Sequence, residues 1–442
     1  MLGWLFACDP GPVLDGGCAL TPDNALRASC SFTVDPPAAL TLTLDGTTWS
    51  SPEGPEHELT LWRMPPESTL GWVARAGEAE RTGELTTGEL PPLASLTVEH
   101  TGEPAPSDTM FLANCGEPAA VVLDPLGQVV WYQALSEGLP QEILPVGLTW
   151  TEDHTVLAVL DRHWVREFAL DGAQVAELGP TPEVIHHDVF RRDGYTWVLN
   201  ARPQTVDGTT YVVDGFYRFD PEGEIDVDWE LSQIATPSGP GGIGGVYWGI
   251  SFPGAQEWAH SNGLWVTEDH DLVWSMHTFS TVVRLEGDPS DPAFGTPEWV
   301  LDGSGTSPWA STFSVVDPSG VTDDDGFGHQ HHPTLEPDGT LRLFDNGESL
   351  TDVARALELS LDPGAGTATI TGSWSLPGAV CPIEGAAFRL PDGDLLVTCA
   401  LTSTYYRIAA ADGEILGSTR ATCEGTSGFN PLPRAIPVDL TP

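Results

Sequence analysis

A repeated unit of short strands and tight turns is the feature that most constrains the fold of this chain. Beyond Met110, stretches such as AAVVLDPLGQVVWYQ and LEPDGTLRLFDNG follow one scheme, in which strands alternate with Gly-containing turns. We identify six such units of four strands. Units of this kind are typical of a β-propeller, whose sheets close radially around a central channel. The repeat therefore predicts an all-β chain whose main body is a six-bladed β-propeller.

The composition agrees with many short strands. The 442 residues include 48 Gly and 39 Pro, and hydrophobic residues make up 40%, enough for a packed core. Alternating segments such as ALTLTLDG predict a small β-sandwich of the fibronectin type III kind before the propeller, although these strands could also extend the propeller. We expect a signal-like or lipoprotein-like N-terminus with a linker over 1–29, the sandwich over 30–106 and the propeller over 107–442.

The charge of the chain limits its partners. There are 64 acidic residues against 17 basic ones, and the formal net charge is -47. A surface this negative repels nucleic acid and anionic lipid headgroups, so we expect neither as a main partner. An anionic substrate would need a locally positive pocket.

The seven cysteines suggest export. The stretch LFAC ends a short apolar run at Cys8 and resembles a bacterial lipoprotein cleavage box. Lipidation of Cys8 would give a lipid anchor and place the protein in the periplasm or on the cell surface. The other six could form three disulfides in an oxidising compartment or stay as buried thiols. They are Cys18, Cys30, Cys115, Cys381, Cys399 and Cys423.

Histidines occupy the same place in three of the units. The stretches IHHDV, WAHSNGLWV and GHQHHPTL each stand directly before the first strand of a unit. The innermost strand of a propeller sheet lines the channel, so residues that lead into these strands converge on the axis. The shared phase therefore predicts one site that contains His187, His260 and His331.

These stretches resemble the bacterial arylsulfotransferase family, propeller enzymes that move a sulfuryl group between phenols without a nucleotide sulfate donor. The matching segments are HHD at 186–188, WAHSN at 258–262, QH at 330–331, LFDNG at 343–347 and ARALELSLD at 354–362. The resemblance extends from about residue 106 to the C-terminus. It implies transfer from an aryl sulfate ester to a phenolic acceptor, with no cofactor and no metal.

The resemblance also implies roles for individual residues. His331 corresponds to the histidine that is transiently sulfated in a ping-pong reaction. His187, His260 and Asn262 correspond to residues that hold the sulfuryl oxygens. Where the family has an arginine, this chain has His277. A fixed guanidinium is thus replaced by an imidazole whose charge depends on pH.

Further residues are candidates for substrate binding. Arg355 could supply a cation, or it could form a structural ion pair. Trp248 and Trp258 could form a wall for a phenol, or they could pack in the core. His186 and Gln330 stand beside the implied catalytic residues. The remaining polar neighbours are expected to shape the loops, namely His329, His332, Asp345 and Asn346.

Two other classes of function stay open. One is a propeller enzyme with a histidine-rich metal site, for which His187 and Asp188 would supply mixed nitrogen and oxygen ligands. The other is a surface lipoprotein that binds aromatic or glycan ligands without turnover. A serine hydrolase is disfavoured because the sequence has no G-x-S-x-G motif. A homodimer formed through the N-terminal domain is a further expectation.

Overall fold

The computed structural model describes residues 12–93, 95–135, 138, 145–160, 162–239, 245–317, 320, 326–349, 352–423 and 434–441. Strands dominate these residues, and the all-β prediction is confirmed. The helical segments assigned there are α1 (Gly245–Trp248) and the 3-10 turns Pro91–Leu93, Leu231–Gln233 and Ala400–Thr402. Within the described ranges no helix has the length and apolar character needed to cross a membrane. Cys8 lies outside the described residues.

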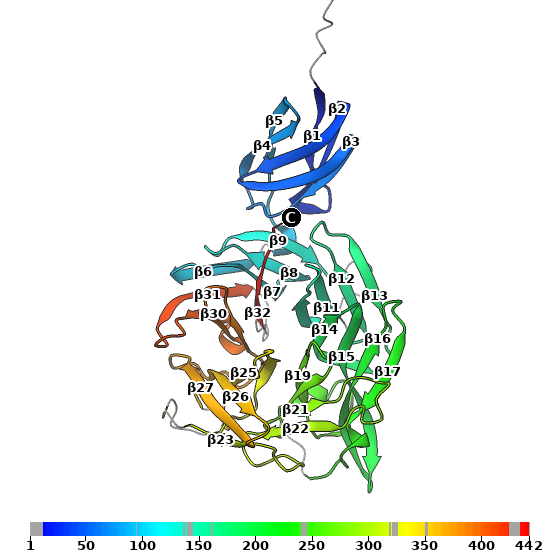
Figure 1. Ribbon diagram of the computed structural model, residues 1–442, viewed down its shortest axis with the longest axis vertical. Coiled ribbons are helices and arrows are strands. Elements are labelled where there is room, and N and C mark those ends of the chain that lie inside the picture. Colours follow the sequence, from blue (N-terminus) through cyan, green and yellow to red (C-terminus); the bar gives the residue numbers. More distant parts are fainter. Residues whose placement is uncertain are drawn as a thin grey trace, which may run out of the picture.

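The N-terminal domain is one sheet that curls around its own core (Figure 1). Its order is β1-β2-β4-β5, with β3 also paired to β2, and the outer strands β1 and β5 contact each other. Leu40, Leu42 and Trp72 lie in this core. The strands are β1 (Val13–Thr21), β2 (Asn24–Leu44), β3 (Thr47–Leu61), β4 (Thr69–Ala76) and β5 (Ala79–Thr86).

Two boundaries differ from those expected from the sequence. Residues 13–29 were expected in a linker, but they form β1 and the start of β2, which a disulfide between Cys18 and Cys30 joins. The adjacent Gly16 and Gly17 break the hydrophobic alternation that would have revealed β1. The strand β6 (Leu96–Gly102) was expected in the sandwich but pairs with a strand of the main body.

The main body consists of six sheets, each with four or five strands. The first four, listed from the innermost strand, are as follows. The first sheet contains β10 (Pro145–Trp150), β11 (Val156–Leu160), β12 (Trp164–Phe168) and β13 (Gln174–Leu178), and the second contains β14 (Val184–Arg192), β15 (Tyr195–Val206), β16 (Thr209–Phe219) and β17 (Ile225–Glu230), with β18 (Gln256–Glu257) paired to β16. The third sheet contains β19 (Ser261–Val266), β20 (Leu272–Met276), β21 (Thr281–Leu285) and β22 (Pro297–Asp302). The fourth contains β24 (His331–Leu335), β25 (Thr340–Asp345), β26 (Arg355–Asp362) and β27 (Thr367–Ser375), with β23 (Ser314–Val316) paired to β27.

The last two sheets close the ring. One contains β28 (Ala386–Arg389), β29 (Leu395–Cys399), β30 (Thr404–Ile408), β31 (Ile415–Cys423) and β6. The other contains β32 (Ala435–Val438), β7 (Asp108–Asn114), β8 (Pro118–Leu123) and β9 (Val129–Ala134). Strands from both ends of the propeller sequence therefore share each of these sheets.

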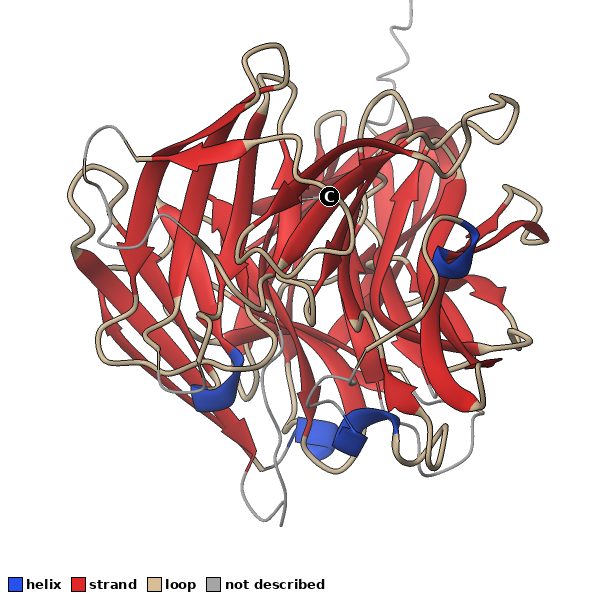
Figure 2. Cartoon of the chain, turned by 90° about the horizontal axis from the view of Figure 1, so that it is seen from below, coloured by secondary structure: helices blue, strands red, loops and turns tan. Residues whose placement is uncertain are grey.

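The innermost strands contact one another in a closed cycle, from β10 through β14, β19, β24, β28 and β32 back to β10. The sheets surround a common axis, as in a β-propeller (Figure 1). Strands make up most of the body, and the short helical segments lie outside the sheets (Figure 2).

Aromatic side chains hold neighbouring sheets together. Trp229 of the second sheet stacks on Phe216 with ring centroids 5.3 Å apart, and it meets Trp274 of the third sheet edge-on at 5.2 Å. All three are buried. Burial of large apolar side chains such as these contributes roughly 1.5–3 kcal/mol each, so the sheets keep fixed positions around the axis.

The six described cysteines form three disulfides, as the sequence allowed. Cys18 pairs with Cys30, and Cys381 pairs with Cys399. The third bond joins Cys115, just after β7, to Cys423 at the end of β31. It therefore links the two sheets in which the ring closes.

Replacing Cys115 and Cys423 together by Ala should lower the unfolding temperature of the ring more than replacing Cys381 and Cys399 together by Ala. The sequence separations are 308 and 18 residues. Loop-closure entropy then gives stabilisations of roughly 5 and 3 kcal/mol. Scanning calorimetry in non-reducing buffer measures the difference. An equal or smaller loss for the long loop would show that its disulfide does not secure the closure.

Candidate active site

The predicted histidines stand where the innermost strands begin, and backbone irregularities aim them at the axis. The pairing of β14 with β15 shifts between His186 and Val189, and that of β24 with β25 shifts between His331 and Thr334. His187 and His332, which lie inside these bulges, have φ of 54° and 50°. A bulge leaves residues unpaired and redirects their side chains. The same kind of bulge at the start of β14 and of β24 explains why these histidines occupy equivalent positions in their sheets.

Six imidazoles form a continuous cluster, which includes His329, whose ring stacks on that of His277 with centroids 4.5 Å apart. Ring centroids are 5.0 Å apart for His186 and His187, and 5.0 Å for His187 and His260. The distance is 5.2 Å from His260 to His277 and 5.7 Å from His277 to His331. The structure thus brings together residues from three sheets, although His186 and His331 stand more than a hundred positions apart in the sequence.

Hydrogen bonds link part of this cluster in a chain. Nδ1 of His260 lies 2.5 Å from Oε1 of Glu257, and Nε2 of His260 lies 3.3 Å from Nε2 of His187. Nδ1 of His187 then lies 2.8 Å from Nδ1 of His186. Nε2 of His186 is 3.4 Å from Oδ1 of the buried Asp214, and burial raises the pKa of Asp214 to about 7. Hydrogen bonds thus link three imidazole rings to Glu257, and the last ring lies near Asp214 without a hydrogen bond to it.

The environment sets different charges on these rings. Burial lowers the pKa of His186 to about 3 and the pKa values of His187 and His277 well below the ordinary value. Burial also acts to lower the pKa of His260, but the hydrogen bond and charge of Glu257 outweigh it and raise that pKa. Positive charge in the cluster therefore concentrates on His260.

Hydrogen bonds fix the tautomer of His331. Its Nδ1 lies 2.8 Å from Oδ1 of Asn346 and 3.1 Å from the backbone oxygen of His329. The Asn346 amide is itself oriented, because its Nδ2 donates to the backbone oxygens of Cys381 and Glu384. Both neighbours of Nδ1 are therefore acceptors, and Nδ1 must carry the proton. No described residue forms a hydrogen bond with Nε2, whose lone pair stays free.

Two charged residues of the site were missed from the sequence. Glu384 precedes β28 and Arg434 precedes β32, the same phase that the histidines occupy. Oε1 of Glu384 lies 3.8 Å from Nε2 of His187, and burial raises the pKa of Glu384 to about 7. Arg434 Nη1 donates to Oδ1 of Asp188 over 2.9 Å. A search for any polar residue at this phase, rather than for histidine alone, would have found both.

Asn262 and Gln330 brace the strands instead of facing the cluster. Nδ2 of Asn262 donates to the backbone oxygen of Gln330 over 2.7 Å. Nε2 of Gln330 donates to Oγ of Ser275 and to the backbone oxygen of Thr281. Both side chains are buried. They tie β24 to the β19–β20 hairpin and so set the spacing between His260 and His331.

The structure places the other substrate-binding candidates away from an open channel. Nε of Arg355 donates to Asp345 over 2.7 Å in a buried ion pair. Trp258 packs in the core between the second and third sheets. Trp248 is buried and meets the His186 ring edge-on at 4.9 Å. The aromatic residue beside the cluster is Tyr247, whose ring lies 4.8 Å from that of His187.

A cavity of about 130 Å³ lies beside His332, the chain neighbour of His331. His332, Asp188 and Arg434 line it together with the aromatic rings of Trp150 and Phe388. It therefore combines a cation with apolar walls, as an aryl anion requires.

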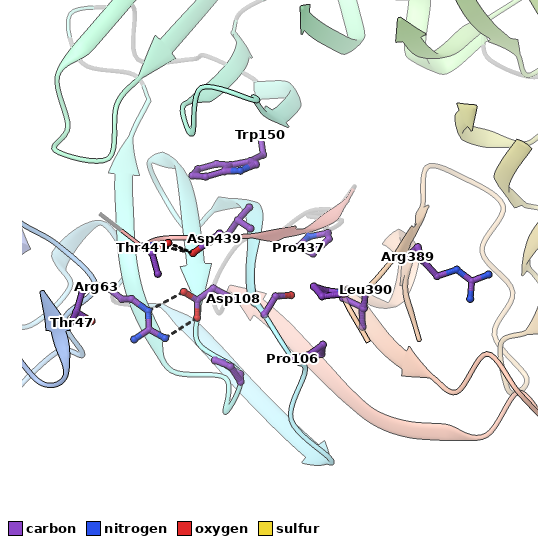
Figure 3. Close-up of a pocket in the computed structure, with 14 residues that line it drawn as sticks. Thr47, Arg63, Pro106, Asp108, Trp150, Arg389, Leu390, Pro437, Asp439 and Thr441 are labelled. Atoms are coloured by element: carbon purple, nitrogen blue, oxygen red, sulfur yellow. Dashed lines mark hydrogen bonds and ion pairs between the residues drawn. The ribbon is translucent and has the colours of Figure 1, made fainter. Parts of the chain in front are cut away.

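A larger cavity of about 730 Å³ shares Trp150 and reaches Thr47 of the N-terminal domain (Figure 3). Its most polar feature is the ion pair of Arg63 with Asp108, in which two hydrogen bonds satisfy both groups. Neither cavity is lined by the clustered histidines, but the smaller one contains His332, the chain neighbour of His331, so we assign the chemistry to the histidine layer.

At neutral pH His331 should be the Nδ1-protonated tautomer, because two acceptors surround Nδ1. Nitrogen-15 NMR of histidine-labelled protein reports the protonation of each ring nitrogen, and His331→Gln assigns the signals. Asn346→Ala removes one acceptor and should shift the tautomer population towards Nε2–H. A wild-type protein with Nε2 protonated would contradict the geometry.

Solved structures similar to this chain share little sequence with it. A protein of unknown function from Bacteroides caccae is 11% identical over 75% of this chain and 99% of that chain, with a TM-score of 0.44. A putative 6-phosphogluconolactonase from Bacteroides uniformis is 13% identical over 70% and 81%, with a TM-score of 0.42. BamB from Moraxella catarrhalis is 10% identical over 74% and 89%, with a TM-score of 0.34.

No curated protein matches the chain. The family model described as Arylsulfotransferase (ASST) matches residues 96–362, a span that holds the clustered histidines and ends before Glu384. This match covers well over half of the sequence, and the chain therefore belongs to the arylsulfotransferase family.

Proposed function

We propose that the histidine cluster transfers a sulfuryl group from an aryl sulfate ester to a phenolic acceptor through a sulfohistidine at His331. The observation that carries this proposal is the fixed tautomer of His331, which leaves the Nε2 lone pair available. Burial lowers the pKa of His331 to about 3, so the ring is a neutral nucleophile at neutral pH.

The reaction has two half-reactions. In the first, the Nε2 lone pair forms a bond to sulfur, the bond from sulfur to the aryl oxygen breaks, and the phenolate leaves with that electron pair. In the second, the oxygen of an acceptor phenol bonds to sulfur and the nitrogen–sulfur bond breaks. The electron pair of that bond returns to Nε2, which restores the free enzyme. Each half-reaction requires an acid or base for the phenol oxygen.

Two groups can hold the charge of the sulfuryl oxygens. Transfer through a loose transition state spreads negative charge over these oxygens, by analogy with phosphoryl transfer. His260 carries positive charge because of Glu257, and Arg434 brings a permanent charge to the cavity beside His332. These groups provide the locally positive site that an acidic protein needs for an anionic ester.

Glu384 suits the role of the acid that protonates the departing phenolate. Its raised pKa of about 7 keeps a large share of the carboxyl protonated at neutral pH. It lies in the same layer, 3.8 Å from Nε2 of His187, and its side chain remains 27% exposed. A leaving phenol could therefore reach it.

We also propose that the six sheets are the blades of a six-bladed propeller and that the N-terminal sheet is a fibronectin type III-like module. Export to the periplasm or the cell surface, with an anchor at Cys8, is consistent with the three disulfides, because such bonds persist in oxidising compartments. A homodimer through the N-terminal domain remains part of this proposal.

The test is incubation with 4-nitrophenyl sulfate and a phenol acceptor. Continued nitrophenol release should require the acceptor; without it, release should stop at about one equivalent per chain, and intact-mass analysis should show one added sulfuryl group. His331→Ala should abolish both signals, because the nitrogen that accepts sulfur is gone. His270→Asn, at the far end of the β19–β20 hairpin, is the control that should keep both.

Three results would contradict the proposal. Equal activity in wild type and His331→Ala would remove His331 from the reaction. Release without an acceptor, at the same rate, would indicate a sulfatase. Absence of any release from the folded wild type, across several aryl sulfates, would leave a protein of this family that binds without turnover.

Arg434→Gln should lower kcat/KM for the aryl sulfate by roughly 100- to 1000-fold, the usual effect of losing one donor to a developing anion. Asp188→Asn removes the ion-pair partner of Arg434 but keeps the guanidinium, so it should cost much less. Steady-state kinetics on both variants measures the contrast. Equal losses would mean that Arg434 acts only through its ion pair with Asp188.

A further inference from the structure

We infer that Glu257, His260 and His277 form a binding site for one divalent transition-metal ion, for which zinc is the natural probe. The inference goes beyond sulfuryl transfer, because His331 is not among the ligands; His260 is shared with the proposed transfer, and a bound dication would take the place of the positive charge that Glu257 induces on it. One carboxylate and two imidazoles, with a position left open, are the protein ligands found in several catalytic zinc sites. This donor set also suits iron(II) and other first-row ions.

The backbone already places the three donors together. One ligand atom from each residue lies within 4.8 Å of the others. Glu257 ends β18, which pairs in parallel with β16, and the other two ligands flank the β19–β20 hairpin. The amide of His277 donates to the backbone oxygen of His260 over 3.1 Å, so their spacing is fixed. The site is thus preorganised by two neighbouring sheets.

Two potential ligand atoms of these three residues form no hydrogen bond within the described parts of the chain. Oε2 of Glu257 and Nδ1 of His277 are buried, and neither has a hydrogen-bond partner within the described parts of the chain. Glu257 is 3% exposed and His277 is 9% exposed. An unsatisfied buried polar group destabilises the fold, more strongly if it is charged. A bound cation would satisfy both atoms at once.

The surroundings supply the outer contacts that metal ligands need. A ligating histidine usually donates its second N–H to another group, which fixes the ring. With Nδ1 of His260 on the ion, its Nε2 faces Nε2 of His187 at 3.3 Å, an acceptor in the neutral ring. Thr278 Oγ1 donates to Oε1 of Glu257 over 3.2 Å and steadies the carboxylate.

Binding requires one local adjustment. Nδ1 of His260 and Oε1 of Glu257 are 2.5 Å apart, whereas ligands of a tetrahedral zinc ion lie roughly 3.4 Å apart, given bonds of about 2.0–2.1 Å. Rotation of the carboxylate so that Oε2 meets the ion, while Oε1 stays on Thr278, provides this separation. The backbone need not move.

A second acidic group provides an internal contrast. Asp271, Glu286 and Glu298 also place ligand atoms within 4.8 Å of one another. Arg284 forms ion pairs there with Asp271 and, over 2.9 Å, with Glu298. Its guanidinium already pairs with two of the three carboxylates there, while no described arginine forms an ion pair with Glu257. We therefore place the ion at Glu257 and not at the second group.

The experiment is zinc titration of the full chain after treatment with a chelator, followed by calorimetry and elemental analysis. We expect one zinc per chain. Glu257→Gln and His277→Phe should each weaken zinc binding roughly 100-fold or more. Loss of an outer-shell partner costs about 10- to 100-fold in metal affinity, and these two residues are proposed as direct ligands. Glu286→Gln is the matched control in the second group and should leave binding unchanged. Unfolding temperatures of the metal-free variants show whether they fold.

Cobalt(II) bound to the wild type gives a test that needs no variant. Its absorption should show the ligand field of a low-coordinate site with nitrogen and oxygen donors, and zinc should displace it. His331→Ala should retain zinc, which separates this inference from the proposed sulfuryl transfer. The inference is overturned if the wild type binds no stoichiometric zinc, if folded Glu257→Gln and His277→Phe bind as tightly as wild type, or if Glu286→Gln loses the ion.

Discussion

Pairing of β32 with β7 is the interaction on which the remaining structure depends. It joins residues 435–438 to residues 108–111 and completes the sixth sheet. Only a closed ring brings the starts of all the innermost strands to one layer. Without this pairing the imidazoles of separate sheets would face water independently. The packing of aromatic rings between sheets then holds the layer at fixed spacing, so a distant strand pair controls the geometry of the chemistry.

Burial and hydrogen bonding give chemically identical imidazole rings different pKa values and therefore different charges. His331 stays neutral because it is buried and its neighbours are acceptors, whereas His260 gains charge from a carboxylate at hydrogen-bond distance. In the proposed transfer, histidine therefore supplies both a nucleophile and a cation within one cluster. Arg434 and His260 would provide the positive charge that an anionic ester needs in this strongly acidic chain.

The repeat allowed prediction of the all-β fold and of the phase at which the site residues stand. A search limited to histidine did not reveal Glu384 and Arg434, although both occupy the same phase. The repeat could not separate Trp248 and Trp258 from a binding wall either, because Trp248 ends α1 and Trp258 follows β18, where no strand alternation distinguishes core from channel. The side-chain amide groups of Asn262 and Gln330 donate to backbone oxygens of neighbouring strands. Only the register between sheets determines these contacts, and the sequence does not reveal it.

The position of Arg434 at the start of β32 also bears on the order of events during biosynthesis. Every other strand of the ring precedes it in the chain, so a ribosome that has translated all of the site histidines has not yet made the guanidinium that accompanies them. An intermediate that lacks β32 would therefore lack both the closed ring and the permanent charge that the proposed transfer uses. On this proposal, reactivity should appear only after the final strand has docked.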